Sequence, residues 1–219
     1  MPRTPVDIGA TFDSIAEAFD ATRAQPWSFV TDWLEGLGPL ERPVVDVGCG
    51  NGRHLAVAGQ RGMRGIGVDL SGRLLAIARQ RVGPDTDLLI GDARDLPIAT
   101  DAAGAVLAVA VIHHIQEAGG RKDAVSEIRR VLAPGGEAIV SVWALDDPDV
   151  AARARARPME GGDGADMLVP WRAPGGPTVD RYLRVISPGE LAEMLVNGGL
   201  EVARSWDAGA NHVALVHAP

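Results

Sequence analysis

Three short apolar runs in the first half of the sequence each lead into residues that can hold a polar ligand. The first run leads into the glycine-rich loop at residues 46–52, the second ends in Asp69, and the third is followed by Asp92. Glycine lets a loop adopt positive φ and lets a ligand approach the backbone closely. An acidic residue about 20 positions after such a loop can accept hydrogen bonds from both hydroxyls of a ribose. The spacing predicts a cofactor that contains a nucleoside.

The glycine spacing bears on which cofactor this is. The loop reads Gly-x-Gly-x-Gly, and Arg53 stands where the dinucleotide fingerprint Gly-x-Gly-x-x-Gly has its third glycine, which disfavours NAD. Asp92 can accept a hydrogen bond from an adenine amino group, and NAD enzymes have no reason for this third acid. The pattern therefore favours a different adenosine-containing cofactor.

Each of these residues also has a simpler structural interpretation. Asp69 could cap the helix that follows Ser71, and Asp92 could sit in a turn. Cys49 is interpreted as a small loop residue, because no nearby base marks it as a nucleophile. The functional interpretation of the acids rests on their coincidence at the ends of successive strands.

An alternation of strands and helices must position these loops. Apolar runs at residues 43–48, 64–69, 87–90, 105–112 and 137–143 alternate with helical patterns that begin at about Gly52, begin after Ser71 and end near Leu132. A helix at 187–197, with Ser187 as N-cap, and two strand-like runs at 201–206 and 212–217 follow. The predicted fold class is α/β, a doubly wound Rossmann-like sheet of seven mainly parallel strands, with helices on both faces and an antiparallel last strand.

The domain organisation is predicted to be a single domain over residues 1–219. Residues 1–40 form two amphipathic helices, and residues 144–184 form an insert or substrate loop rich in Gly, Pro, Asp and Arg. Such a long loop inside a compact domain is usually functional or disordered.

Composition bears on where the protein is located and on which metals and nucleic acids it can bind. No apolar stretch is long enough to cross a membrane and no signal peptide begins the chain, so we expect a cytoplasmic protein that makes no membrane contact. Cys49 is the only cysteine, so any structural zinc must come from a partner and no metal site is predicted. The net charge of −8 argues against nonspecific binding of nucleic acid. Lys122 is the only lysine and Asp outnumbers Glu, a bias expected of a high-GC genome and of proteins adapted to strong salt, in which the repulsion would be weaker.

The chain resembles the class I S-adenosylmethionine (SAM)-dependent methyltransferases over nearly its whole length. It resembles most the family that methylates 5-carboxymethyluridine at the wobble position of tRNA, which in eukaryotes acts with a small zinc-binding activator. The resemblance rests on segments 21–27, 46–54, 110–114, 141–144, 169–171, 181–182 and 205–206. The chain departs from the family at Ala103 and Gly104, where members usually carry Phe-Asp, and in its few lysines.

The resemblance implies specific roles for site residues. The cofactor SAM would be held by Asp46, Gly48, Cys49, Gly50, Asn51, Gly52, Asp69, Leu70, Asp92, Ala93 and Ala110. A carboxylate nucleophile is already ionised at neutral pH and needs no general base, so its pocket should supply cationic and hydrogen-bonding groups. The catalytic candidates are Arg23, His113, Arg181 and Asn211.

Several of these candidates have competing explanations. Arg23 could instead pair with Asp20 or Asp13, and His113 could be structural, as His114 is expected to be. The aromatic residues Trp143, Trp171 and Tyr182 could stack on a base or belong to the core. The arginines at 153, 155 and 157 could bind phosphate or form a solvated face.

The resemblance also implies a partner surface. The third strand should be an edge strand, and its apolar Leu88, Leu89 and Ile90 would be an aggregation hazard unless covered. In the resembled family the activator docks on this edge by strand addition. We therefore expect a heterodimer with a small zinc-ribbon protein.

Three functions remain open from the sequence. The first is a methyltransferase for a modified wobble uridine of tRNA, and the second is a small-molecule methyltransferase, which the negative charge favours. The third is a SAM-binding subunit without catalysis.

Overall fold

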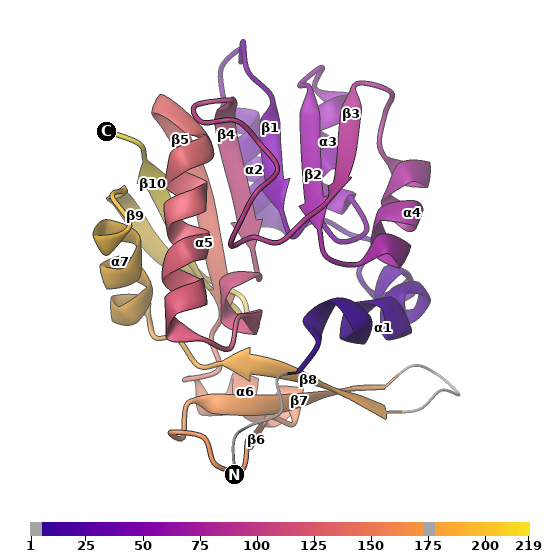
Figure 1. Ribbon diagram of the computed structural model, residues 1–219, viewed down its shortest axis with the longest axis vertical. Helices are drawn as coiled ribbons and strands as arrows, with labels where there is room; N and C mark the ends of the chain where they lie inside the picture. The colour runs from indigo at the N-terminus through magenta and orange to yellow at the C-terminus, as the bar shows by residue number, and fades with distance from the viewer. Residues whose placement is uncertain (1–5, 173–177) are drawn as a thin grey trace.

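A central sheet organises the molecule, and the computed structural model describes it over residues 6–172 and 178–219. Its strands run in the order β3-β2-β1-β4-β5-β10-β9 (Figure 1). They are β1 (Val44–Val47), β2 (Gly65–Asp69), β3 (Thr86–Ile90), β4 (Ala103–Val109), β5 (Leu132–Trp143), β9 (Glu201–Ala208) and β10 (Asn211–His217). Strands β1 to β5 are parallel, and β10 is antiparallel to both β5 and β9. This confirms the predicted fold class, including the antiparallel last strand.

Helices cover both faces of this sheet. They are α2 (Ser28–Gly36), α3 (Arg53–Gln60), α4 (Gly72–Arg81), α5 (Ala118–Val131) and α7 (Pro188–Asn197), with a short 3₁₀ turn η1 (Ile112–His114) after β4. Helix α1 (Ile8–Thr22) packs against α4 and the later strand β8 (Thr178–Arg184) instead. The helix starts follow from their caps: Ser71 accepts a hydrogen bond from the Leu74 amide, and Ser187 accepts one from the Glu190 amide. Ser187 thus has the predicted N-cap role.

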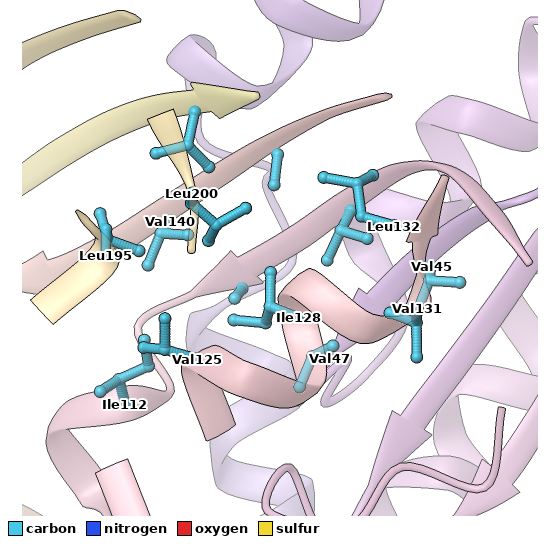
Figure 2. Close-up of a cluster of buried hydrophobic side chains, with 14 of the residues drawn as sticks. Val45, Val47, Ile112, Val125, Ile128, Val131, Leu132, Val140, Leu195 and Leu200 are labelled. Carbon is cyan, nitrogen blue, oxygen red and sulfur yellow. The ribbon is translucent and has the colours of Figure 1, made fainter. Parts of the chain in front are cut away.

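Two hydrophobic layers fix the sheet between these helices. Val45 and Val47 of β1 pack with α5 and α7, whereas Val44 packs with α2 and α3 on the opposite face, because alternate residues of a strand point to opposite faces. Figure 2 shows the first layer, in which Ile128 of α5 and Leu195 of α7 lie among strand valines. The carboxyl ends of β1 and β4 meet between these layers, where the strand order reverses and ligands bind in sheets of this type.

Residues 144–184 were expected to form an insert or substrate loop, but the described residues of this segment form regular elements, so the expectation of an irregular loop was wrong, and the role in substrate binding stays a prediction. It contains α6 (Pro148–Ala154) and a three-stranded antiparallel sheet of β6 (Arg157–Pro158), β7 (Asp166–Arg172) and β8 (Thr178–Arg184), which we call the small sheet. Its own core includes Val150, Val169 and Leu183. Figure 1 shows the small sheet next to the carboxyl ends of the central strands.

The edges of the central sheet are β3 and β9, so the predicted edge position of β3 is confirmed. Ile90, at the end of β3, is 63% exposed, which makes this edge both unpaired and apolar. A separate property of the described residues is that none of their helices has the length and apolar character needed to cross a membrane.

Candidate functional site

A cavity of about 650 Å³ lies at the carboxyl ends of the central strands. Its wall comes from the glycine-rich loop, the ends of β2 and β3, the turn after β4, helix α1, Trp143 at the end of β5, and Arg181 of β8 in the small sheet. The predicted cofactor residues that line it are Gly48, Cys49, Gly50, Asn51, Asp69, Leu70, Asp92, Ala93 and Ala110. The other two, Asp46 and Gly52, lie behind the wall.

The glycine-rich loop has the backbone that its sequence predicted. Gly48 has φ +68°, and a Cβ at this position would lie 2.5 Å from Cγ2 of Val111. Gly52 has φ +73° and is the N-cap residue of α3. Burial raises the pKa of the Cys49 thiol well above its usual value, which agrees with its interpretation as a small loop residue. Larger residues at Gly48 would push the turn after β4 away from the loop.

Asp69 connects the glycine-rich loop to the start of α4. Its Oδ2 accepts from the Gly50 amide at 2.8 Å, and its Oδ1 accepts from the Ser71 amide at 2.8 Å. Burial raises the pKa of Asp69, and these two amide hydrogen bonds oppose that rise. Because each carboxylate oxygen has a second lone pair, Asp69 keeps capacity to accept from ribose hydroxyls in the cavity. The site therefore fits an adenosine-containing cofactor.

Asp92 is engaged by a residue that the sequence interpretation missed. Its Oδ1 accepts from the Arg94 amide at 2.9 Å, and its Oδ2 accepts from the Arg94 guanidinium at 2.6 Å. Asp92 thus has the turn role that was its simpler explanation, and its contact with adenine stays a prediction. Arg94 also lines the cavity, but neither its type nor its spacing marked it.

Asp46, at the start of the glycine-rich loop, is buried and does not line the cavity. Burial raises its pKa to about 8, and burial lowers the pKa of His54, 3.9 Å away, to about 3. The Trp27 amide donates to Nε2 of His54 at 3.5 Å. Oδ2 of Asp46 therefore lies near His54 without a hydrogen bond to any described residue, whereas His54 contacts the segment before α2.

Acidic residues of helix α1 bind it to the glycine-rich loop and to α4. Asp13 accepts from the Ser71 hydroxyl at 2.5 Å, and Asp20 accepts from Asn51 at 2.8 Å and from Arg81 at 2.7 Å. Neither acid pairs with Arg23, so the explanation of Arg23 as an ion-pair partner of Asp13 or Asp20 was wrong. The side chain of Asn51 is committed to Asp20.

Two arginines meet at tryptophan rings on the other side of the cavity. The guanidinium carbon of Arg23 lies 5.2 Å from the ring centroid of Trp171. That of Arg181 lies 4.8 Å from the same centroid and 5.3 Å from that of Trp143. Arg181 is only 4% exposed, yet among the described residues no carboxylate pairs with either arginine.

The electrostatics of this cluster favour an anion. Burial lowers the pKa of Arg181 to about 10, and the charge of Arg23 adds to this. Burial, again with Arg23, lowers the pKa of Arg53 to about 10. Like charges in a buried site repel one another, and an anion bound between them would offset this repulsion. The arrangement can bind and orient a carboxylate.

The other two catalytic candidates do not line the cavity. His113 and Asn211 are fully buried, and Nδ1 of His113 accepts from the Trp143 amide at 3.1 Å. Asn211 pairs with Trp143 across β10 and β5, and neither polar atom of its side chain has a hydrogen-bond partner within the described part of the chain. Both lie next to Trp143, and their catalytic roles stay predictions.

The remaining candidates divide between site, core and surface. Trp143 lines the cavity, whereas Tyr182 is fully buried and donates to Asp166 at 2.6 Å, so base stacking by Tyr182 was a wrong interpretation. The arginines at 153, 155 and 157 are exposed, and Arg157 pairs with Asp180. Across residues 6–172 and 178–219, no three His, Cys, Asp or Glu side chains gather in a metal-binding arrangement.

Comparisons with known proteins bear on the chemistry of this site. The family model described as a methyltransferase domain matches residues 45–140. The tRNA (carboxymethyluridine(34)-5-O)-methyltransferase of Schizosaccharomyces pombe is 37% identical over 164 residues, which is 75% of this chain and 67% of that protein. The mouse enzyme of the same name, ALKBH8, is 36% identical over 139 residues, or 64% of this chain. This chain spans only 20% of ALKBH8 and 40% of an Arabidopsis thaliana relative.

A solved structure shares the fold. It is the methyltransferase in a complex with the Haloferax volcanii Trm112 methyltransferase activator. The TM-score is 0.73 at 20% identity, and the match covers 97% of this chain and 98% of that one.

Proposed function

Because the chain belongs to the SAM-dependent methyltransferase family, we propose that it methylates the carboxylate of a modified wobble uridine in tRNA. The observation that carries this proposal is the unpaired cluster of Arg23 and Arg181 against Trp171. A substrate carboxylate would supply the missing counter-charge. The names of the relatives from Schizosaccharomyces pombe and mouse support the same substrate class.

The residues around the cavity would have different roles in methyl transfer. Bound SAM supplies a methyl group on a positively charged sulfur, and Asp69 with the amides of the glycine-rich loop would hold it. Arg23 and Arg181 bind the carboxylate and aim one oxygen at the methyl carbon. The new bond is O–C, the broken bond is C–S with its electron pair left on sulfur, and no proton moves. Most of the rate enhancement then comes from positioning.

Trp143 supports the base that carries the carboxylate. Its ring lines the cavity and contacts Arg181. Aromatic rings stack on unpaired bases in single-stranded RNA recognition. A wobble base turned into the cavity would stack there while its carboxylate reaches the arginines.

Methyl transfer to different substrates tests this function. Labelled SAM is incubated with tRNA that carries 5-carboxymethyluridine, with tRNA that lacks it, and with a metabolite extract. We expect label in the first tRNA, and at least a tenfold loss for Arg181→Lys, because lysine cannot make the planar bidentate contact. The matched control is Arg204→Lys, since Arg204 lies over Trp206 on the edge strand β9.

Other outcomes would contradict the proposal. Label in metabolites alone would indicate a small-molecule methyltransferase, which the net charge of −8 favours. SAM binding without transfer to any fraction would indicate a non-catalytic subunit.

We also propose a cytoplasmic heterodimer with a small zinc-binding activator protein. Its docking surface would be the outer edge of β3, with Leu88, Leu89 and Ile90. An unpaired strand with an exposed apolar end is suited to strand addition. The solved methyltransferase in complex with a Trm112 activator, which shares this fold, supports the proposal.

Co-purification with a zinc-ribbon activator tests the partner. Ile90→Asp should abolish or strongly weaken the complex, because it places a charge on the docking edge. Val196→Asp is the matched control, since Val196 is 56% exposed on α7, away from β3. A wild-type chain that stays monomeric and fully active on tRNA beside the activator would contradict the proposal.

A further inference from the structure

Two consecutive histidines follow β4, and each contacts a backbone group through Nδ1. The group is an amide donor for His113 and a carbonyl acceptor for His114. The Trp143 amide donates to Nδ1 of His113, so this nitrogen is unprotonated and the proton of the neutral ring is on Nε2. Nδ1 of His114 lies 2.8 Å from the Tyr182 carbonyl oxygen. A carbonyl oxygen can only accept, so this Nδ1 carries the proton and Nε2 keeps a free lone pair.

Both rings stay neutral in this environment. Burial lowers the pKa of His114 to about 3, and the charge of Arg181 adds to the effect. Burial also places the pKa of His113 well below its usual value, with further contributions from His114 and Arg181. The two histidines are therefore a donor and an acceptor whose roles do not change over the physiological pH range.

The acceptor lies in the cavity wall beside the small sheet. The His114 ring lines the cavity, between Tyr182 of β8 and the Phe12 ring of α1, which is nearly perpendicular to it with a centroid 5.2 Å away. No hydrogen bond joins its Nε2 to any described residue. Asp69 and Asp92 face the cavity from the ends of β2 and β3 instead.

Nε2 of His114 differs from the neighbouring arginines because it accepts a hydrogen bond. The proposed carboxylate-binding groups, Arg23 and Arg181, can only donate hydrogen bonds. A substrate held by these arginines therefore meets a neutral acceptor close by. Because the ring cannot gain a proton near neutral pH, it selects for a group that donates.

We propose that His114 is a specificity residue that accepts a hydrogen bond from the imide N3–H of a uracil ring. This rests on the proposed function, in which the carboxylate of the same base lies on Arg23 and Arg181. A cytosine ring presents a lone pair at N3 and would be repelled. A site built to hydrogen-bond a substrate group rejects analogues that lack it.

Two substitutions of His114 distinguish acceptance of a substrate hydrogen bond from the structural contact of His114 with Tyr182 in the small sheet. In His114→Asn the side-chain amide takes the place of Nδ1 and can still donate to the Tyr182 carbonyl, but the acceptor at Nε2 is gone. In His114→Gln the amide oxygen takes the place of Nε2, and the contact with Tyr182 is lost. The two substitutions thus remove opposite halves of the ring.

The test compares two anticodon stem–loop RNAs in the presence of the activator, one with 5-carboxymethyluridine and one with its N3-methyl derivative. We expect wild type to prefer the N3–H substrate by about tenfold in kcat/KM, the value of one hydrogen bond. His114→Gln should keep the preference and His114→Asn should lose it. SAM affinity, measured by calorimetry, should be the same in all three proteins.

Two results would overturn the inference while leaving the proposed function intact. One is an undiminished preference for N3–H in His114→Asn. The other is a fall in SAM affinity with the preference kept, which would assign His114 to the cofactor. Failure of wild type to methylate either RNA would instead refute the proposed function. In that case ¹⁵N NMR of His114 still decides the tautomer, and a protonated Nε2 at pH 7 would refute the acceptor.

Discussion

At the scale of single residues, the acids proposed to hold the cofactor and the arginines proposed to hold the substrate line different parts of the cavity. Asp69 and Asp92 supply acceptors at the ends of β2 and β3, and Arg23 and Arg181 supply donors near the small sheet. A cofactor with ribose and adenine donors and a substrate with an anionic acceptor would therefore bind at different ends. In the proposed complex, this arrangement places the transferred methyl group between the cofactor and the substrate.

Replacement of Asp69 tests the cofactor end. Asp69→Asn should weaken SAM binding by about tenfold or more, because a hydrogen bond to a charged group contributes roughly 1.5–3 kcal/mol. Isothermal calorimetry measures the affinity. Asp32→Asn, at an exposed position of α2, is the control and should bind SAM as wild type does. Equal affinity in both variants would remove Asp69 from the cofactor site.

Residue type and spacing predicted the cavity wall better at the glycine-rich loop than near the small sheet. The glycines and Asp69 could be placed because each follows directly on an apolar strand, so local sequence determines both the loop and its location. The tautomers of His113 and His114 could not, because their partners, Trp143 and Tyr182, are 30 and 68 positions away. Arg94 was missed because its residue type does not show that the turn at Asp92 brings its side chain to the cavity.

At the scale of elements, a charged histidine joins the segment after β5 to the β9–β10 hairpin. Nδ1 of His212 lies 2.6 Å from Asp207, and Nε2 lies 2.6 Å from Asp146. Both ring nitrogens face carboxylates, so the ring is held as a cation. Burial by itself would lower the pKa of His212, but the hydrogen bonds to Asp146 and Asp207 raise it.

This arrangement predicts how stability depends on pH. A histidine whose pKa is raised by folding contributes stability that is fully present below its unfolded pKa of about 6.5. That contribution is lost as the pH rises through the folded pKa. We expect His212→Gln to cost about 1 kcal/mol at pH 6, since Asp146 is partly exposed and Asp207 mostly exposed, and less at pH 9. Urea unfolding at both pH values measures this, and an equal cost at each would contradict it.

The packing of α7 on the central sheet makes a separate prediction. Leu195 is fully buried in the layer of Figure 2, so Leu195→Ala should lower the free energy of unfolding by about 2–5 kcal/mol. The adjacent Val196 is exposed on the same helix, and Val196→Ala should change it by only about 0.5 kcal/mol. Denaturant unfolding compares the two, and similar effects would show that α7 does not pack as described.

Element prediction succeeded in the central sheet and failed in the small one. Long apolar runs such as that of β4 mark buried parallel strands by themselves. In β7, Pro170 and flanking polar residues interrupt the alternation that identifies an antiparallel strand. The β7–β8 pairing depends on tertiary contacts, such as those of Tyr182, Asp166 and Arg184, which no local pattern carries.

At the scale of the whole molecule, the net charge of −8 should make stability depend on salt. Raising KCl from 0.1 M to 1 M shortens the Debye length from about 10 Å to about 3 Å and screens the repulsion among surface acids. We expect the melting temperature to rise over this range. Sucrose at matched osmolality is the control, and a melting temperature that falls in KCl would contradict the prediction.

The position of β10 between β5 and β9 has a consequence for synthesis on the ribosome. Strand β9 is made first, but it reaches the sheet only through β10. A nascent chain that has emerged as far as β9 therefore presents the bare flank of β5 to other chains, a hazard common to incompletely folded sheets. Translational pausing just before β10 would prolong this exposure, and rapid elongation there would favour a high yield of native protein.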